Sequence, residues 1–179
     1  MNNTNSQFEQ AISICRDIFV KKMEDYGAAW RVLRPISLTD QIFIKAQRIR
    51  SLEIKKEQKI NEDIKGEYIG IVNYAIMALI QLELGFSNNN IDDKSIILDK
   101  YNFYANEALE LMKKKNHDYD EAWRSMRISS YTDLILMKLY RTKQIEDNEG
   151  KTIVSEGIDA NYFDMINYSV FALIKLHFN

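Results

Sequence analysis

Two copies of an Asp-Tyr-x-x-Ala-Trp-Arg segment, at residues 25–31 and 118–124, carry the side chains best suited to binding a ligand. Tyr and Trp offer flat faces on which a nucleotide base can stack, and Arg can donate a forked pair of hydrogen bonds to a phosphate or a carboxylate. A second Arg lies three residues beyond each copy, and a Lys-x-x-Arg pair follows further along. Each copy therefore has enough cationic side chains to surround a polyphosphate, which favours a nucleotide or a nucleotide-like small molecule as the ligand.

The residues predicted to contact this ligand are Tyr26, Trp30, Arg31, Arg34, Lys45, Arg48, Asp118, Tyr119, Trp123, Arg124, Arg127, Lys138, Arg141 and Asn167. A structural interpretation of the same segments stays open, in which Trp anchors a helix corner and Asp caps a helix or pairs with Arg. Solvent exposure of the two indoles separates the interpretations. No catalytic residue is assigned, since the sequence has no Gly-rich phosphate loop, nucleophile elbow or zinc signature.

A second candidate site lies near the C-terminus, where Glu156, Ala160, Asp164 and Asn167 are spaced by four, four and three residues. On a helix this spacing places them along one face. Asp164 is embedded in an apolar segment, and a buried carboxylate is costly unless it is paired or bound to a metal. Glu156 and Asp164 are therefore predicted to hold Mg²⁺, which commonly takes one or two carboxylates together with substrate phosphates.

The alternative for Asp164 is a salt bridge with Lys138 or Arg141 on a neighbouring helix. The first half of the chain has Gly70 where the second has Asp164, so a metal site of this type is predicted to be single. Glu67, which aligns with Asn161, is a partial substitute.

An internal repeat organises the chain. Residues 22–53 align without a gap with residues 115–146, a shift of 93, and 14 of the 32 aligned positions are identical where composition alone would give roughly two. The third helical segments align with a shift of 94. Few interchangeable core residues are among the identities, whereas Asp, Tyr, Trp and five cationic positions are kept.

Apolar residues recur at helical spacing, and we find no strand-like alternation, so the chain is predicted to be all-α. Two tandem three-helix repeats should pack about a pseudo-twofold axis into one helical bundle, because neither repeat alone covers its very apolar third helix. Pro35 should keep the connection after the first helix non-helical, and Ser37 and Ser130 are cap-like. The predicted single domain spans 1–179, with repeat one at about 8–84, a linker at 85–95 and repeat two at about 96–177; the helices are expected at 8–24, from 37–40 onward, 62–84, 96–115, 132–146 and 159–177.

The charge and the lengths of the apolar runs argue against some classes of binding partner. Lys and Arg number 24 and Asp and Glu 26, for a net charge of −2, which argues against duplex nucleic acid gripped by phosphate neutralisation. The longest apolar run is short for a membrane span, so no membrane partner is expected. The N-terminal segment lacks the regions of a signal peptide, so a cytoplasmic location is expected. The single cysteine, Cys15, is predicted to be buried.

The whole chain resembles the nucleotide modification associated domain 1 family in a tandem form. The resemblance rests on Asp25-Tyr26-Gly27-x-x-Trp30 with its second copy, Asp133-x-x-x-x-Lys138-x-x-Arg141, Glu156, and Asp164-x-x-Asn167-Tyr168. It implies an association with nucleotide or base modification. The acidic third helix is also loosely similar to that of all-α nucleoside triphosphate pyrophosphohydrolases, but each repeat keeps only half of their Glu-x-x-Asp pair.

The first hypothesis is therefore a nucleotide-binding protein, extended to Mg²⁺-dependent processing of the nucleotide. The alternative is a non-catalytic helical scaffold or dimerisation module, whose partner would be a second copy of the chain in a homodimer. The sequence leaves open whether the chain is an enzyme and whether both repeats function.

Overall fold

The computed structural model describes residues 2–55, 60–89 and 93–178, and all regular structure in this part of the chain is helical. In chain order the elements are α1 (Asn2–Tyr26), the 3₁₀ helix η1 (Ala29–Val32), α2 (Pro35–Lys55), α3 (Ile60–Leu84), α4 (Lys94–Tyr119), the 3₁₀ helix η2 (Ala122–Ser125), α5 (Ile128–Asp147) and α6 (Ile158–Phe178). The predicted all-α bundle of two three-helix repeats is confirmed. Residues 90–92 of the expected linker lie outside the described part.

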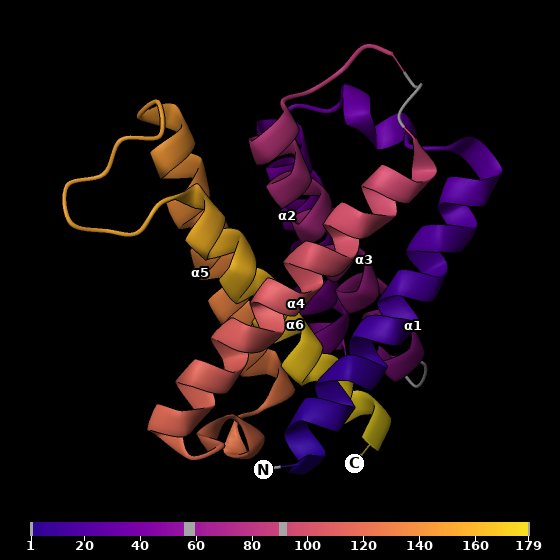
Figure 1. Ribbon diagram of the computed structural model, residues 1–179. Coiled ribbons are helices and arrows are strands. Elements are labelled where there is room, and N and C mark those ends of the chain that lie inside the picture. Colours follow the sequence, from indigo (N-terminus) through magenta and orange to yellow (C-terminus); the bar gives the residue numbers. More distant parts are fainter. Residues whose placement is uncertain (1, 56–59, 90–92, 179) are drawn as a thin grey trace.

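The third helices of the two repeats, α3 and α6, pack against each other at the centre of the bundle (Figure 1). On one side α2 packs on α3 and α5 packs on α6, while α2 and α5 also contact each other. On the other side α1 and α4 contact each other and both central helices. The two termini lie at the same end of the molecule (Figure 1).

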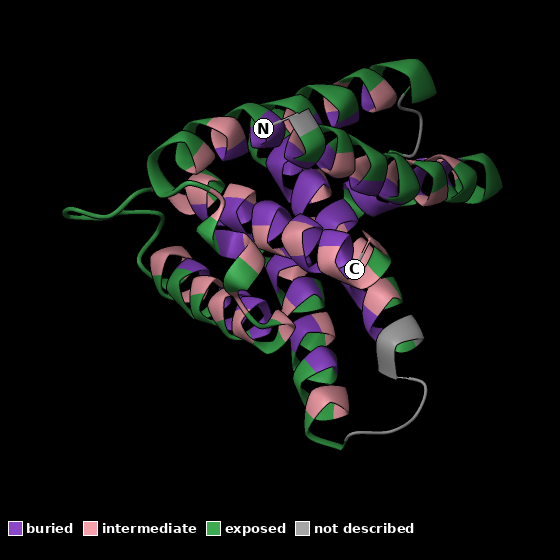
Figure 2. Cartoon of the chain, turned by 90° about the horizontal axis from the view of Figure 1, so that it is seen from below, coloured by how far each residue is buried: buried purple, intermediate pink, exposed green. Residues whose placement is uncertain are grey.

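The composition of α3 and α6 explains this central place. Both helices are buried around most of their circumference, and the buried residues of the bundle concentrate on the central helices (Figure 2). By length and apolar composition α3 could cross a membrane, but 67% of the relevant stretch between Asp63 and Leu84 is buried inside the bundle. A central core helix has the same composition, because apolar neighbours surround it on nearly all sides. Cys15 is also buried, as predicted.

The first residues of α2 and α5 differ from the predicted helix starts. Pro35 is the first residue of α2 and does not lie in a non-helical connection. A proline fits this position, because the first helical residue has no backbone hydrogen bond to lose. Ser37 and Ser130 consequently lie within the first turns of α2 and α5, so the predicted cap roles of these two serines are wrong.

Two equivalent polar clusters join the repeats across the pseudo-twofold axis. In one, Thr39 Oγ1 lies 2.5 Å from Tyr162 Oη and 3.3 Å from Glu146 Oε2. The second cluster repeats the first with the halves exchanged: Thr132 Oγ1 lies 2.6 Å from Tyr68 Oη and 2.5 Å from Glu53 Oε1. Each cluster thus takes its threonine from one repeat and its tyrosine and glutamate from the other, which gives the kept Thr and Glu positions a structural role.

Ion pairs on the surface of the same α2–α5 contact follow the same exchange. Arg50 Nη2 lies 2.6 Å from Asp133 Oδ1, and at the equivalent positions Lys143 Nζ lies 3.3 Å from Asp40 Oδ1. These pairs are partly exposed, so their contribution to stability is small compared with the buried clusters. Their placement nevertheless explains why an aspartate is kept at this position of both repeats.

The carboxyl group of Glu146 makes the stability of this interface dependent on pH. Burial, together with Asp40 and Asp147, outweighs the hydrogen bond from Thr39 and raises the pKa of Glu146 to about 7. Because the folded protein then holds this proton more tightly than the unfolded chain, the stabilisation is fully present below the unfolded pKa of about 4.5 and is lost as pH rises through about 7.

We expect the free energy of unfolding to fall between pH 5 and pH 8 and the variant Glu146→Gln to show a smaller fall, because an amide keeps a neutral group at all pH values. Urea titrations across this range measure the effect, with Glu107→Gln, at an exposed position on α4, as the matched control. An identical pH slope in wild type and Glu146→Gln would contradict the assignment.

Candidate functional site

The two Trp-Arg segments form the corners between the first and second helix of each repeat. In repeat one α1 ends at Tyr26, and the φ of +67° at Gly27, the next residue, lets the chain turn toward η1. In repeat two Asp120 and Glu121 adopt φ angles of +46° and +57° before η2. Each segment thus begins in the last turn of a first helix and continues into the connection to the second helix.

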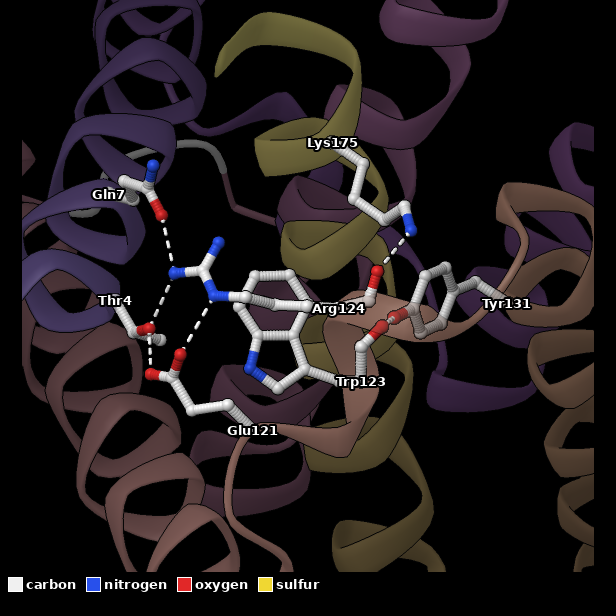
Figure 3. Close-up of polar contacts among 7 residues, drawn as sticks. All are labelled: Thr4, Gln7, Glu121, Trp123, Arg124, Tyr131 and Lys175. Atoms are coloured by element: carbon white, nitrogen blue, oxygen red, sulfur yellow. Dashed lines mark hydrogen bonds and ion pairs between the residues drawn. The ribbon is translucent and has the colours of Figure 1, made fainter. Parts of the chain in front are cut away.

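Side chains cover both faces of the Trp123 indole, and Figure 3 shows one of them, Arg124. One face stacks on Phe171 with ring centroids 4.3 Å apart and planes tilted by 10°, and the Arg124 guanidinium carbon lies 4.4 Å from the centroid of the indole. Only 6% of Trp123 is exposed. In this structure the ring therefore has no free face for a base.

The Arg124 guanidinium is held by neighbouring side chains and not by Asp118 (Figure 3). Its Nε donates to Glu121 Oε2 at 2.8 Å, and its Nη2 donates to Thr4 Oγ1 at 2.6 Å and to Gln7 Oε1 at 2.8 Å. These contacts fasten the second corner to the start of α1. The structural interpretation of the segment is supported here, although the acid that pairs with the arginine is Glu121 and not the predicted aspartate.

The first corner has a similar construction with different partners. Trp30 is 8% exposed and packs near Phe19, with ring centroids 6.3 Å apart. Arg31 is buried and donates through Nη1 to Gln81 Oε1 and to the Gly85 carbonyl oxygen. Arg31 thus joins the corner to the end of α3.

One side chain from each central helix closes its corner at matching atoms. Gln81 Nε2 donates to the carbonyl oxygen of Arg31 at 2.9 Å and to that of Leu33 at 2.5 Å. Lys175, 94 residues later, donates through Nζ to the carbonyl oxygen of Arg124 at 2.7 Å and to that of Met126 at 2.5 Å. We call Gln81 and Lys175 the pinning residues, because each donates hydrogen bonds to two carbonyls at the end of a 3₁₀ helix.

A cavity of about 340 Å³ lies beside the first corner, between α1, α2 and α3. Its walls include the aromatic side chains of Tyr26, Trp30 and Tyr74 and the lysine side chains Lys22 and Lys45. Lys45 Nζ lies 5.7 Å from the centroid of the Tyr74 ring, and burial, with Tyr74 next, raises the pKa of Tyr26. The cavity therefore brings flat rings and cationic groups together at one place, partly open to solvent through Tyr26, which is 52% exposed.

Two glycines of α3, Gly66 and Gly70, line the same cavity. A Cβ atom on Gly70 would lie 2.6 Å from Lys45 Cε, so the lysine stem occupies the space that a larger side chain would fill. Glycine is unfavourable within a helix, by about 1 kcal/mol relative to alanine. Its use here is what lets Lys45 cross over the central helix.

The other predicted residues of repeat one lie outside this cavity. Arg34 is exposed, and Arg48 is exposed with its Nη1 2.8 Å from Glu67 Oε1. Lys45 Nζ lies 3.3 Å from the other carboxylate oxygen of Glu67. The structure therefore brings Tyr26, Trp30 and Lys45 together at the cavity and leaves the two arginines at the surface.

The predicted residues of repeat two do not converge on one place. Asp118, Tyr119 and Arg127 are exposed, with Tyr119 71% exposed. Lys138 and Arg141 line a broad open groove of about 960 Å³ together with Glu156 and the segment that precedes α6. Figure 2 shows this segment extending from the bundle as an exposed loop.

Asn167 lies in the core, where neither polar atom of its side chain has a hydrogen-bond partner in the described part of the chain. Its counterpart Asn73 donates to the Cys15 carbonyl oxygen at 3.0 Å and accepts from Tyr101 Oη at 2.8 Å. The residue 93 positions before Tyr101 is Phe8, which has no hydroxyl group to offer Asn167. The asymmetry between the repeats thus accounts for the unpaired amide.

Asp164 is the buried carboxylate that the sequence assigned to Mg²⁺. Its Oδ1 lies 2.7 Å from Lys115 Nζ and its Oδ2 lies 2.7 Å from Lys138 Nζ. The predicted alternative, a salt bridge with Lys138, is the arrangement observed. Glu156 is exposed, and the described residues contain no group of three or more His, Cys, Asp or Glu side chains that could hold a metal ion. With an ammonium group on each oxygen of Asp164, the two predicted ligands do not fit Mg²⁺ in this geometry.

Comparison with protein-family models matches the nucleotide modification associated domain 1 family over residues 22–82 and 115–176, more than half of the chain. The chain belongs to this family. The two matched segments agree with a tandem form of the domain. No curated protein and no solved structure matches the chain.

The two family segments begin and end at equivalent positions of the two repeats. Each nucleotide modification associated domain begins at a lysine, Lys22 or Lys115, and ends one residue beyond its pinning residue. Sequence reasoning missed Lys22, Lys115, Gly70 and Tyr74 as site residues. The signal for the lysines was present, because they are the first of the 14 identical pairs in the aligned segment.

The pinning residues generate a stability prediction. Gln81→Leu removes the donor to the Leu33 carbonyl and one acceptor of the Arg31 guanidinium, while the Arg31 carbonyl keeps its hydrogen bond from Ser87 N. Lys175→Met removes the donor to the carbonyls of Arg124 and Met126. Each substitution is expected to lower the free energy of unfolding by about 1–3 kcal/mol, the cost of unsatisfied buried polar groups. Urea unfolding measures the loss, with Lys114→Met, at an exposed position of α4, as the control. Losses no greater than that of the control would refute the pinning role.

Proposed function

We propose that this protein binds a nucleotide in the cavity of repeat one. The observation that carries the proposal is the meeting of Tyr26, Tyr74, Lys22 and Lys45 at one partly open cavity. Tyrosine rings can stack on a base, and lysine ammonium groups can bind phosphate oxygens as point charges. The base is assigned to the two tyrosines and the phosphate to the two lysines.

The size of the cavity agrees with this ligand class. Small-molecule sites occupy about 300–1,000 Å³ and are lined by apolar and aromatic side chains with a few polar groups that fix orientation. The cavity of about 340 Å³ lies near the small end of this range. The family description, which associates the domain with nucleotide modification, supports the same class of ligand.

The proposal concerns binding in repeat one, and it assigns no step to Mg²⁺. The expectation that the nucleotide is also processed with Mg²⁺ stays a prediction. It was built on Glu156 and Asp164 as metal ligands, and in the structure both oxygens of Asp164 pair with lysines. The roles expected for Trp30, Trp123 and Arg124 pass from ligand contact to holding the corners.

The second candidate, a helical scaffold or dimerisation module, is favoured by the buried Trp-Arg corners. Under this alternative the corners only lock helices together, and the partner is a second copy of the chain. A nucleotide titration separates the candidates, because the scaffold requires no ligand in the cavity.

Equivalent tyrosines of the two repeats provide a matched test. Tyr26→Leu removes a ring from the cavity and is expected to weaken nucleotide binding at least fivefold, since stacking of a base on an aromatic ring contributes about 1–3 kcal/mol. Tyr119→Leu changes the equivalent exposed ring in repeat two and should leave the affinity unchanged.

Isothermal titration calorimetry with adenosine, guanosine, cytidine and uridine 5′-monophosphates measures the affinities. Binding by none of the four nucleotides, with a dimer detected by sedimentation, would replace the proposal with the scaffold. Equal losses in the two tyrosine variants would show that the nucleotide binds elsewhere.

A further inference from the structure

Two lysines that line the cavity of repeat one have counterparts in repeat two, and there the protein itself supplies the acid that pairs with them. Lys22 and Lys45 correspond to Lys115 and Lys138 at a shift of 93, and Gly70 corresponds to Asp164 at the shift of 94 that relates the third helices. In repeat two the three side chains form a closed set, with one ammonium group 2.7 Å from each oxygen of the carboxylate.

The carboxylate of Asp164 is deeply placed, whereas one of its lysines reaches solvent. Asp164 is buried, Lys138 is largely buried and Lys115 is half exposed. Burial lowers the pKa of Lys115, but the hydrogen bond and the charge of Asp164 outweigh burial and raise it. Lys115 and Lys138 thus bind one acidic group between them, and in repeat two this group is the Asp164 side chain.

Repeat one keeps the two lysines and lacks the carboxylate. Gly70 has no side chain, and Lys45 crosses the space that a Cβ atom would need. Lys22 makes no ion pair with any residue in the described ranges, and it lines the cavity together with Lys45 and Gly70.

The acid that pairs with Lys45 is Glu67, which lies on α3 one turn before Gly70 and also pairs with Arg48. Glu67 Oε2 lies 3.3 Å from Lys45 Nζ, longer than the 2.7 Å between Lys138 and Asp164, and the other Glu67 oxygen pairs with Arg48. Its counterpart Asn161 is neutral and donates to the Gly157 carbonyl oxygen. Glu67 therefore holds Lys45 loosely, and Lys22, which lines the same cavity, adds a second lysine without an acid partner in the described part of the chain.

We infer that an acidic group of the ligand binds between Lys22 and Lys45 in the cavity that Gly70 also lines, and that it takes the role that the Asp164 carboxylate has for the equivalent lysines of repeat two. The group is a phosphate, and repeat two is the permanently occupied copy, so each chain binds one ligand. This inference rests on the proposed function for the rest of the ligand, but the phosphate subsite itself requires no base.

The substitution Gly70→Asp tests the inference by supplying the missing carboxylate, with Gly70→Asn as a control of the same shape without charge. Asp and Asn differ little in helix propensity. The aspartate variant is expected to melt about 2 °C or more above the asparagine variant, and to bind inorganic phosphate and adenosine 5′-monophosphate at least tenfold more weakly than the asparagine variant. The clash with Lys45 involves the far end of a flexible side chain, which can move in both variants.

The reverse substitution, Asp164→Gly, recreates the arrangement of repeat one in repeat two. Calorimetric titration with inorganic phosphate is expected to change from one site per chain in the wild type to two sites in this variant. Acetate, titrated in parallel, reports binding of a carboxylate in place of a phosphate and should bind at least tenfold more weakly. Circular dichroism establishes that each variant is folded, and if Asp164→Gly does not fold, the pair of Gly70 variants decides alone.

The outcomes separate this inference from the proposed function. Phosphate binding that Gly70→Asp abolishes, with no gain in affinity for adenosine 5′-monophosphate over phosphate, supports the inference and removes the nucleotide. Nucleotide binding with equal affinity in the Gly70→Asp and Gly70→Asn variants overturns the inference and leaves the proposed function standing. Equal affinity for acetate and phosphate overturns the assignment of the acidic group as phosphate.

Discussion

A polar side chain on a helix that is buried on nearly every side must find a partner, and this constraint governs both central helices of the bundle. On α3 the amide of Asn73 bonds α1 and α4, Gln81 closes a corner and Glu67 pairs with cations of α2. On α6 Asp164 pairs with two lysines and Lys175 closes the other corner. These paired polar positions therefore fix the placement of the surrounding elements, and Asn167 on α6, which has no hydrogen-bond partner in the described part of the chain, is an exception.

The need of a buried polar side chain for a partner also explains how the two repeats differ. Where repeat two keeps a buried carboxylate, it satisfies two lysines and gains a fully paired set. Where repeat one has Gly70, the carboxylate is missing, the lysines remain and a cavity lies beside them. One copy of the duplicated unit thus serves packing, and the other retains the chemical groups to bind an anion.

The repeat architecture was predictable from the sequence, because 14 identical positions in register and a third apolar segment in each half leave few other folds. The contacts that use those identities were not predictable within either repeat. Thr39 and Glu53 each contact the other repeat across the pseudo-twofold axis. The partner of Thr39, Tyr162, lies 123 positions away, and the partner of Glu53, Thr132, lies 79 positions away. A pattern confined to one repeat carries no record of such an exchange.

The candidate site was predictable only in part. Tyr26, Trp30 and Lys45 do line a cavity, but the sequence could not show whether an aromatic residue beside a corner faces solvent or the core. Trp123 is buried because Phe171 and Arg124 cover its two faces, and helical periodicity does not connect Phe171, on α6, to Trp123. Gly70 was missed as a site residue because its contribution is the space left by an absent side chain.

The most direct measurement is an experimental structure of the protein crystallised with adenosine 5′-monophosphate. We expect electron density for one nucleotide per chain, with its phosphate between Lys22 Nζ and Lys45 Nζ and its base against Tyr26 or Tyr74. A nucleotide bound in the open groove beside Lys138 and Arg141, with the repeat-one cavity filled by side chains, would contradict this expectation.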